Sequence, residues 1–228
     1  MKKLLLSLAL NFFTLHALSI PTEVQQLLVV MVDDSKQNKA LLYAYERESN
    51  SSNQSWNYVF SAIPVTLGRQ GIALGMGLHQ LPFMQKDTLD NKIEGDGKSP
   101  AGLFKLSTVF GYQSQNPNPK MPYLHLNQDL HCVDDSQSKY YNQIISKRSG
   151  YKSFEQMRRN DNLYEFGIVV EHNKEALASR GSCIFIHIMN RKKEATAGCT
   201  AMSRKNLLKI IAWLDQKKNP AFLLYLNP

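Results

Sequence analysis

The sequence predicts a mainly β protein of the α+β class, in which an antiparallel sheet or sandwich carries peripheral helices. Short apolar runs bounded by polar turns recur near the start of the chain at the spacing that is typical of strands. One later segment, after Ser203, has the apolar spacing of a helix that packs one face on a core. No fixed-period repeat or long linker interrupts the chain, so we expect a single domain over residues 20–228.

The composition is that of an ordinary globular protein. Apolar residues make up 43% and aromatic residues 10% of the 228 positions, which excludes a disordered chain. The formal net charge of +8 suits an anionic partner such as nucleic acid or a cell-wall polymer. Because the longest basic run is only Arg191-Lys192-Lys193, we expect ordinary surface charge and no nucleic-acid partner.

The first residues have the pattern of a secretory signal peptide. Lys2 and Lys3 precede a mostly apolar stretch over residues 4–18, and Ala17-Leu18-Ser19 places small residues where a signal peptidase reads them. The apolar stretch is shorter than the roughly 20 residues of a membrane span, although a retained N-terminal anchor is the alternative. We predict a signal peptide over residues 1–19 and an exported protein with no stable membrane insertion after cleavage.

The strands begin directly after this segment. Residues 27–32 and 40–45 are apolar runs on either side of a polar turn, which predicts a β-hairpin. Residues 56–60 and 61–67 are predicted as a third and a fourth strand. A glycine-rich turn over residues 94–102 then leads into another apolar run.

Part of that turn, Gly97-Lys98-Ser99, has the residues of a phosphate-binding loop, but this interpretation fails. The motif requires a glycine where the chain has Lys92, and Pro100 would obstruct the helix that must follow. We predict instead a structured turn that feeds a strand.

Residues 111–163 are less regular and are predicted to form an elaboration packed against the sheet, as one wall of a groove. Within them, residues 153–159 are predicted as a short helix capped by Ser153. His125, His131 and Cys132 could suggest a metal site, but their spacing matches no strong ligand pattern. We expect structural roles for these three residues, and no metal.

The last third of the chain brings a histidine and a cysteine into one short stretch. Strands are predicted at residues 166–170 and 184–188, and His187 lies in the second. Cys199 follows directly after Gly198, in a loop before a helix that Ser203 caps and Asn219-Pro220 ends. A strand that delivers an imidazole and a loop that delivers a thiol can form a nucleophilic Cys/His site.

Strand geometry favours this pair over a metal site. Cys183 and His187 would lie on one face of a strand about 13 Å apart, too far to share one metal ion easily. Cys199 can approach His187, and Gly198 would let backbone N–H groups face an oxyanion. The helix N-terminus and the basic residues 191–193 would favour the thiolate. The alternative is an ordinary buried histidine and a buried thiol.

The cysteine count is odd, which in an oxidising compartment suggests one disulfide and one free thiol. A bridge between Cys132 and Cys183 would spare Cys199. Two separate buried thiols are the alternative.

The stretch from Gly181 to Ser203 resembles the active-site segment of the L,D-transpeptidase catalytic domain family, which remodels bacterial peptidoglycan. The family pattern is a strand histidine, a variable loop, then Ser or Thr, one residue, Gly and the nucleophilic Cys. It corresponds here to His187 and to Thr196-Ala197-Gly198-Cys199. The turn Gly97–Phe104 resembles the Thr-Pro-x-Gly-x-Phe turn of the family, with Ser99 in place of Thr. The resemblance covers most of the chain from Glu94 onward.

The resemblance implies a β-sandwich of mixed sheets with an elaborated groove-side insertion and a C-terminal helix. It also implies a cysteine transpeptidase that needs no cofactor and no metal. Cys199 would attack the L,D peptide bond of a stem tetrapeptide, His187 would transfer the proton, and D-Ala would leave before an amine acceptor arrives. The candidate substrate-binding residues are Ser99, Tyr141, Asn190, Thr196 and Thr200.

The chain departs from the family pattern at two positions. Many members carry His at the position of Ala197 and Arg at the position of Ala201. The contact with a substrate carboxylate is therefore in doubt, and Arg191, Arg204 or Lys98 could substitute for the missing arginine.

Two other functions remain open. Water could resolve the same acyl-enzyme, which would make the protein an L,D-carboxypeptidase, or the chain could be a non-catalytic peptidoglycan-binding module. In each case we expect a monomer that meets peptidoglycan stem peptides in the periplasm or cell wall of a bacterium.

Overall fold

The computed structural model describes residues 20–48, 55–78 and 89–227. The predicted signal peptide over residues 1–19 lies outside them. Within the described part, the protein is mainly β with one α-helix, as the sequence predicts. No helix among the described residues is long and apolar enough to cross a membrane.

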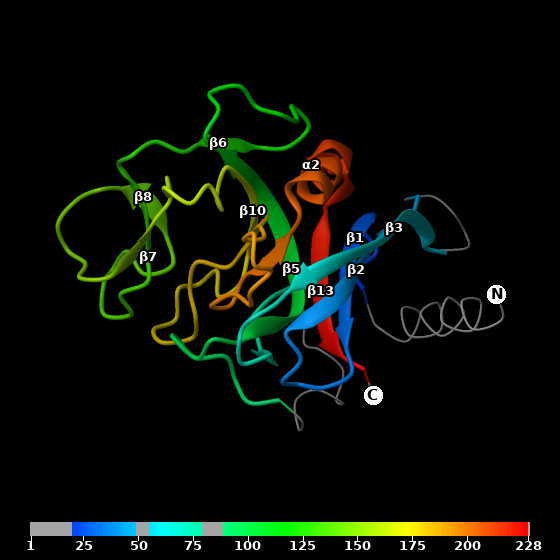
Figure 1. Cartoon of the computed structure of the whole chain (residues 1–228), viewed down its shortest axis with the longest axis horizontal. Coiled ribbons are helices and arrows are strands. Elements are labelled where there is room, and N and C mark those ends of the chain that lie inside the picture. Colours follow the sequence, from blue (N-terminus) through cyan, green and yellow to red (C-terminus); the bar gives the residue numbers. More distant parts are fainter. Residues whose placement is uncertain (1–19, 49–54, 79–88, 228) are drawn as a thin grey trace.

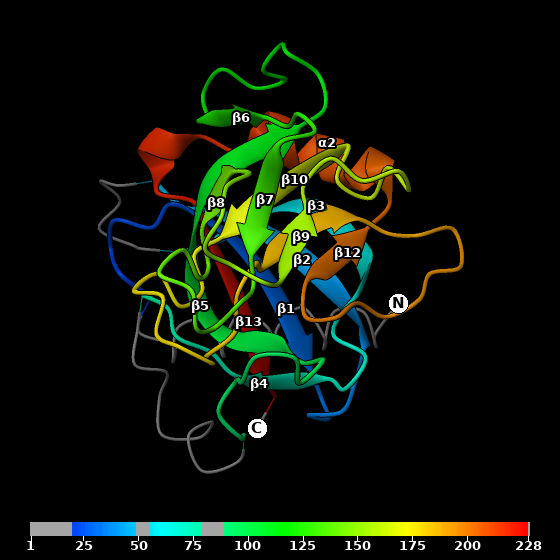
Figure 2. The same cartoon turned by 90° about the vertical axis from the view of Figure 1, so that its left-hand side faces the viewer.

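The main sheet is mixed and closes on itself (Figures 1 and 2). Its strands are β1 (Gln26–Val32), β2 (Lys39–Glu46), β3 (Asn57–Thr66), β4 (Ile72–Leu74), β5 (Ser99–Gly111), β6 (Tyr123–His125), β10 (Phe166–Val170), β11 (Phe185–Ile188), β12 (Thr200–Met202) and β13 (Ala221–Leu226). They pair in the order β10-β11-β12-β3-β2-β1-β13-β5-β4, and β10 also pairs with β5. The pairings thus give one barrel-like sheet and do not resolve the two facing sheets of the predicted sandwich.

Strand β1 shows why the sheet forms. It lies between β2, antiparallel, and β13, parallel, and it is apolar from Leu27 to Val32. Leu28 and Val30 pack into the main core, whereas Leu27 and Val29 pack into a second cluster on the other face. A strand buried on both faces reads as a continuous apolar run, and each such side chain contributes about 1.5–3 kcal/mol.

The helix α2 (Arg204–Trp213) closes one side of the main core, and the short 3-10 helix η1 (Gln216–Lys218) follows it. Ser203 caps α2 by accepting a hydrogen bond from the backbone N–H of Asn206, as the sequence predicts. Leu207, Ile210 and Ile211 are the buried face. The helix ends at Trp213, well before the predicted stop at Asn219-Pro220.

A small separate sheet forms the elaboration. It consists of β7 (Leu130–Val133), β8 (Ile144–Ser146) and β9 (Phe154–Gln156), and Figure 2 shows it in front of the main sheet. The predicted helix over residues 153–159 is therefore wrong. A helix of about two turns has little stability alone, whereas β9 gains the pairing with β7 and the stacking of Phe154 on His131, with ring centroids 3.7 Å apart.

Other boundaries also differ from the prediction. Residues 57–66 form one strand, β3, rather than two, and β5 begins at Ser99, inside the predicted turn. β13 was not predicted, although it is a central strand between β1 and β5.

Candidate active site

Two adjacent parallel strands present His187 and Cys199. His187 lies in β11 and is paired with Ala201 of β12, and Cys199 directly precedes β12. Because residues two positions apart share a strand face, Cys199 and Ala201 lie on the same side as His187. Strand spacing places the Cα atoms of His187 and Cys199 about 8 Å apart, which lets their side chains meet.

Both side chains are buried at one cavity wall, with 7% of His187 and 6% of Cys199 exposed. The Cys199 sulfur accepts from the backbone N–H of Phe185 at 3.3 Å and lies 3.5 Å from the carbonyl oxygen of Cys183. The Nδ1 atom of His187 lies 2.8 Å from the carbonyl oxygen of Ile188. This contact assigns the proton to Nδ1, and so leaves Nε2 as the basic atom.

The resting pair is neutral. Burial, and next the negative charge of Glu155, raise the pKa of the Cys199 thiol to about 12. Burial lowers the pKa of the His187 imidazole to about 4. The prediction that the surroundings favour a thiolate is therefore wrong. The strand β12 separates Cys199 from the N-terminus of α2, and the basic residues 191–193 are exposed.

Two hydroxyl groups hold the backbone of the candidate nucleophile. Thr196 Oγ1 donates to the Cys199 carbonyl oxygen at 2.6 Å, and Ser99 Oγ donates to the same oxygen at 3.2 Å. Ser99 comes from β5 and is only 1% exposed, so it positions Cys199 and does not line the cavity. Sequence reasoning predicted it instead as a substrate contact.

Gly198 differs from the prediction in its role. Its N–H donates to Thr196 Oγ1 at 3.1 Å, so it is already used within the loop. Its φ is not among the positive values of the chain. A Cβ at this position would lie 3.1 Å from the Lys98 carbonyl oxygen, so glycine serves the close approach of two backbone segments.

The other predicted residues divide between the cavity and the interior. Asn190 lines the cavity and exchanges hydrogen bonds with Glu194, at 2.9 Å each. Thr200 is buried and alternates away from Cys199 and Ala201. Tyr141 is also buried, and its hydroxyl donates to Glu94, so it is not a groove residue.

The cavity itself has a volume of about 160 Å³. Sequence reasoning missed several of its residues, among them Glu155, Arg159 and Tyr164. The Tyr164 hydroxyl donates to Glu155 at 2.5 Å, and the Tyr164 ring meets the His187 ring edge-on with centroids 5.2 Å apart. No motif marks these residues, because Glu155 and Arg159 belong to the irregular segment 111–163 and Tyr164 directly follows it.

Residues 28–222 match the family model described as the L,D-transpeptidase catalytic domain (YkuD). The chain belongs to the L,D-transpeptidase catalytic domain family. Members are usually cysteine-dependent transpeptidases that act on peptidoglycan peptides, which implies a place outside the cytoplasm. Comparison with curated proteins gives no match, and comparison with solved structures gives none either.

In this L,D-transpeptidase domain, Ala201 faces the cavity where many members carry arginine. Two of the proposed substitutes are engaged elsewhere: Arg204 forms an ion pair with Glu165, and Lys98 with Asp90. The cation that does line the cavity is Arg159.

A disulfide joins Cys132 of β7 to Cys183, just before β11, with Cα atoms 6.0 Å apart. The Cys183 N–H also donates to Asn142 Oδ1 at 2.9 Å. The bridge and this bond tie the elaboration to the strand that carries His187. Cys199 is the remaining free cysteine among the described residues.

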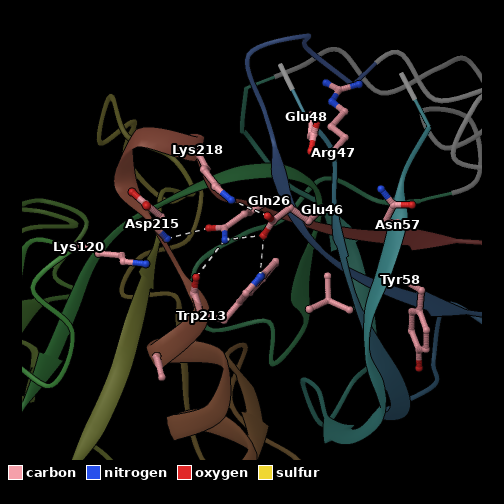
Figure 3. Close-up of a pocket in the computed structure, with 12 residues that line it drawn as sticks. Gln26, Glu46, Arg47, Glu48, Asn57, Tyr58, Lys120, Trp213, Asp215 and Lys218 are labelled. Carbon is pink, nitrogen blue, oxygen red and sulfur yellow. Dashed lines mark hydrogen bonds and ion pairs between the residues drawn. The ribbon is translucent and has the colours of Figure 1, made fainter. Parts of the chain in front are cut away.

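A larger cavity, of about 680 Å³ (Figure 3), shares no lining residue with the cavity of Cys199 and His187. Its walls come from β1 to β3 and the end of α2. Glu46 occupies its floor and accepts from Gln26, Trp213 and Lys218. Among the cavities of the described residues, the smaller one is lined by both a free thiol and an imidazole. No metal-binding group of three or more His, Cys, Asp or Glu residues occurs in the described part of the chain.

Proposed function

We propose that the protein is a peptidoglycan L,D-transpeptidase that acts through a Cys199 acyl-enzyme. The observation that supports this proposal is that Cys199, directly before β12, and His187, in the paired strand β11, line one cavity in a domain of this family. The substrate would be a stem tetrapeptide, and the first product would be D-Ala.

The first step is general-base attack by a neutral pair. His187 Nε2 takes the proton of the Cys199 thiol as the sulfur attacks the carbonyl carbon of the L,D peptide bond. The Phe185 N–H, 3.3 Å from the sulfur, stabilises negative charge on it. Because Gly198 N–H is used by Thr196, the Cys199 N–H is the backbone donor that we assign to the oxyanion. His187 then protonates the leaving amine of D-Ala, and a thioester remains.

The second step resolves the thioester. An amine of a second stem would attack it and give a crosslink, whereas water would give a tripeptide and make the protein an L,D-carboxypeptidase. Neither acceptor changes the roles of Cys199 and His187.

A non-catalytic peptidoglycan-binding module is the second candidate function. The observation that favours it is the buried, protonated state of Cys199, whose pKa is raised to about 12. In that case the cavity would bind stem peptides without turnover.

We further propose that residues 20–228 act as a monomeric domain, exported by the signal peptide over residues 1–19.

The test of the acyl-enzyme hypothesis is to incubate the purified domain with a carbapenem and measure its intact mass. We expect one adduct, absent from Cys199→Ala and formed more slowly by His187→Ala. A wild-type protein that forms no adduct under reducing conditions would contradict the enzyme hypothesis. Analysis of the products formed from tetrapeptide stems then distinguishes hydrolysis, which gives a tripeptide, from crosslinking, which gives a dimer.

A further inference from the structure

The elaboration sends one carboxyl group into the catalytic cavity. Glu155 of β9 is paired with Cys132 of β7, so the two side chains share a face of the small sheet. The Cys132 side chain on that face reaches Cys183 beside β11. The same register therefore aims Glu155 at the Cys/His pair, and it lines their cavity.

Glu155 has little compensation from the protein. Among the described residues, its Oε2 atom accepts a side-chain hydrogen bond from the Tyr164 hydroxyl. The charged groups that face it are Arg159, Asp134 and Glu94. Arg159 is shared, because its Nε and Nη2 atoms bind the Asp161 carboxylate. Burial, opposed in part by Tyr164 and Arg159, leaves the pKa of Glu155 raised.

The surroundings of the cavity are acidic although the whole chain is basic. The Oδ1 atom of Asp134, near Glu155, is buried without a hydrogen-bond partner among the described residues. Glu194 adds an exposed carboxylate to the cavity wall, where it accepts from Asn190 and lies 3.9 Å from Lys192 Nζ, so the buried negative charge is that of Glu155. A positively charged group of a ligand would relieve this accumulation of negative charge.

Resting on the proposed function, we propose that Glu155 is the subsite for a primary ammonium group of the substrate. The ammonium belongs to the diamino residue of the donor stem or to the incoming acceptor. A cavity of about 160 Å³ has room for the end of one side chain and not for a whole peptide. An ammonium group, with three donors on a compact charge, suits a carboxylate at the end of such a cavity.

This arrangement links binding to activation of the thiol. The negative charge of Glu155 is one of the causes that raise the pKa of Cys199. An ammonium ion paired with Glu155 cancels part of that charge, so the thiol loses its proton more easily once substrate is bound. Before substrate arrives, the unpaired charge of Glu155 keeps the thiol protonated and therefore less reactive.

The test compares two tetrapeptide stems that differ only in the side-chain amine of the diamino residue, free or acetylated. Single-turnover release of D-Ala gives the acylation efficiency for the full-length mature chain, Glu155→Gln and the matched control Glu175→Gln, whose side chain is exposed. We expect the wild type and the control to prefer the free amine by about tenfold or more, and Glu155→Gln to lose that preference.

In a second arm, the preformed acyl-enzyme is mixed with acceptors whose amine is free or blocked by methylation, and the use of each acceptor is measured. This comparison distinguishes an acceptor subsite from a donor subsite. Iodoacetamide provides an independent readout, because removing the Glu155 charge should accelerate alkylation of Cys199 at neutral pH. Equal acylation of both stems by the wild type, together with equal use of both acceptors, overturns this inference and leaves the proposed function intact. Acylation of neither stem refutes the proposed function, and with it this inference.

Discussion

The two hydroxyl groups on the Cys199 carbonyl allow a sharp test of how the nucleophile is held. Thr196→Val keeps the shape of the side chain but removes a donor to this carbonyl at 2.6 Å and the acceptor for Gly198 N–H at 3.1 Å. At about 0.5–1.5 kcal/mol for each hydrogen bond, the free energy of unfolding should fall by about 1–3 kcal/mol. Ser99→Ala removes a donor at 3.2 Å and the acceptor for Gly68 N–H at 2.8 Å, with a similar expected cost.

The double variant should cost more than the sum of the two single variants. Each single variant leaves the Cys199 carbonyl with one hydroxyl donor, whereas the double variant removes both. A buried acceptor without a partner costs about 1–3 kcal/mol, so we expect a coupling of about 1 kcal/mol or more. Urea unfolding of the four proteins measures it, with Thr108→Val as the matched control. Additivity within about 0.5 kcal/mol would refute a shared role for the two hydroxyls.

Three further predictions follow from the buried groups. The pKa of His187 and of His172 is lowered to about 4 in the folded protein. Between about pH 6.5 and pH 4 the unfolded chain therefore binds more protons than the folded one, and the free energy of unfolding should fall as the pH is lowered through this range. Above about pH 6.5 these two histidines should leave the free energy of unfolding unchanged. Urea unfolding at several pH values checks this, and a flat profile would contradict it. Alkylation of Cys199 by iodoacetamide should still accelerate well above pH 10, because its pKa is raised to about 12; a rate that levels off by about pH 10 would show an ordinary thiol. Cys132→Ala together with Cys183→Ala opens a loop with a sequence separation of 51, which should cost about 4 kcal/mol in a thermal or urea melt; a loss below about 1 kcal/mol would show that the elaboration holds without the bridge.

The strands and the helix that carry strong periodic signals were predictable from the sequence. The strand with His187 and the helix capped by Ser203 were placed from apolar spacing and one capping residue. Boundaries were less accurate where the chain bends without a turn signal. The sequence was divided into two strands between Phe60 and Ser61, yet residues 57–66 form one strand, β3, in which Pro64 lies opposite Leu41.

The elaboration could not be predicted in the same way. Its strands are only a few residues long and depend on pairing partners far along the chain, as in β9 with β7. Glu155 therefore gives no local sign that it faces the nucleophile. The helix predicted for its segment would also have given it the wrong neighbours.

The electrostatic state of the site also depends on tertiary structure. Sequence proximity to basic residues suggested a thiolate, but Arg191 and its neighbours are exposed, whereas burial dominates at Cys199. Ser99 shows the same limitation. Its motif was recognised, but only the fold reveals that it binds the backbone of Cys199 from 100 positions away.

The most direct test of the central claim is the mass of the protein during reaction with a stem tetrapeptide. The account predicts a transient adduct equal to the stem minus D-Ala, located on the peptide that contains Cys199. The adduct should be absent from Cys199→Ala and slow to form in His187→Gln. An adduct that persists in Cys199→Ala, or D-Ala release that does not require His187, would contradict the account.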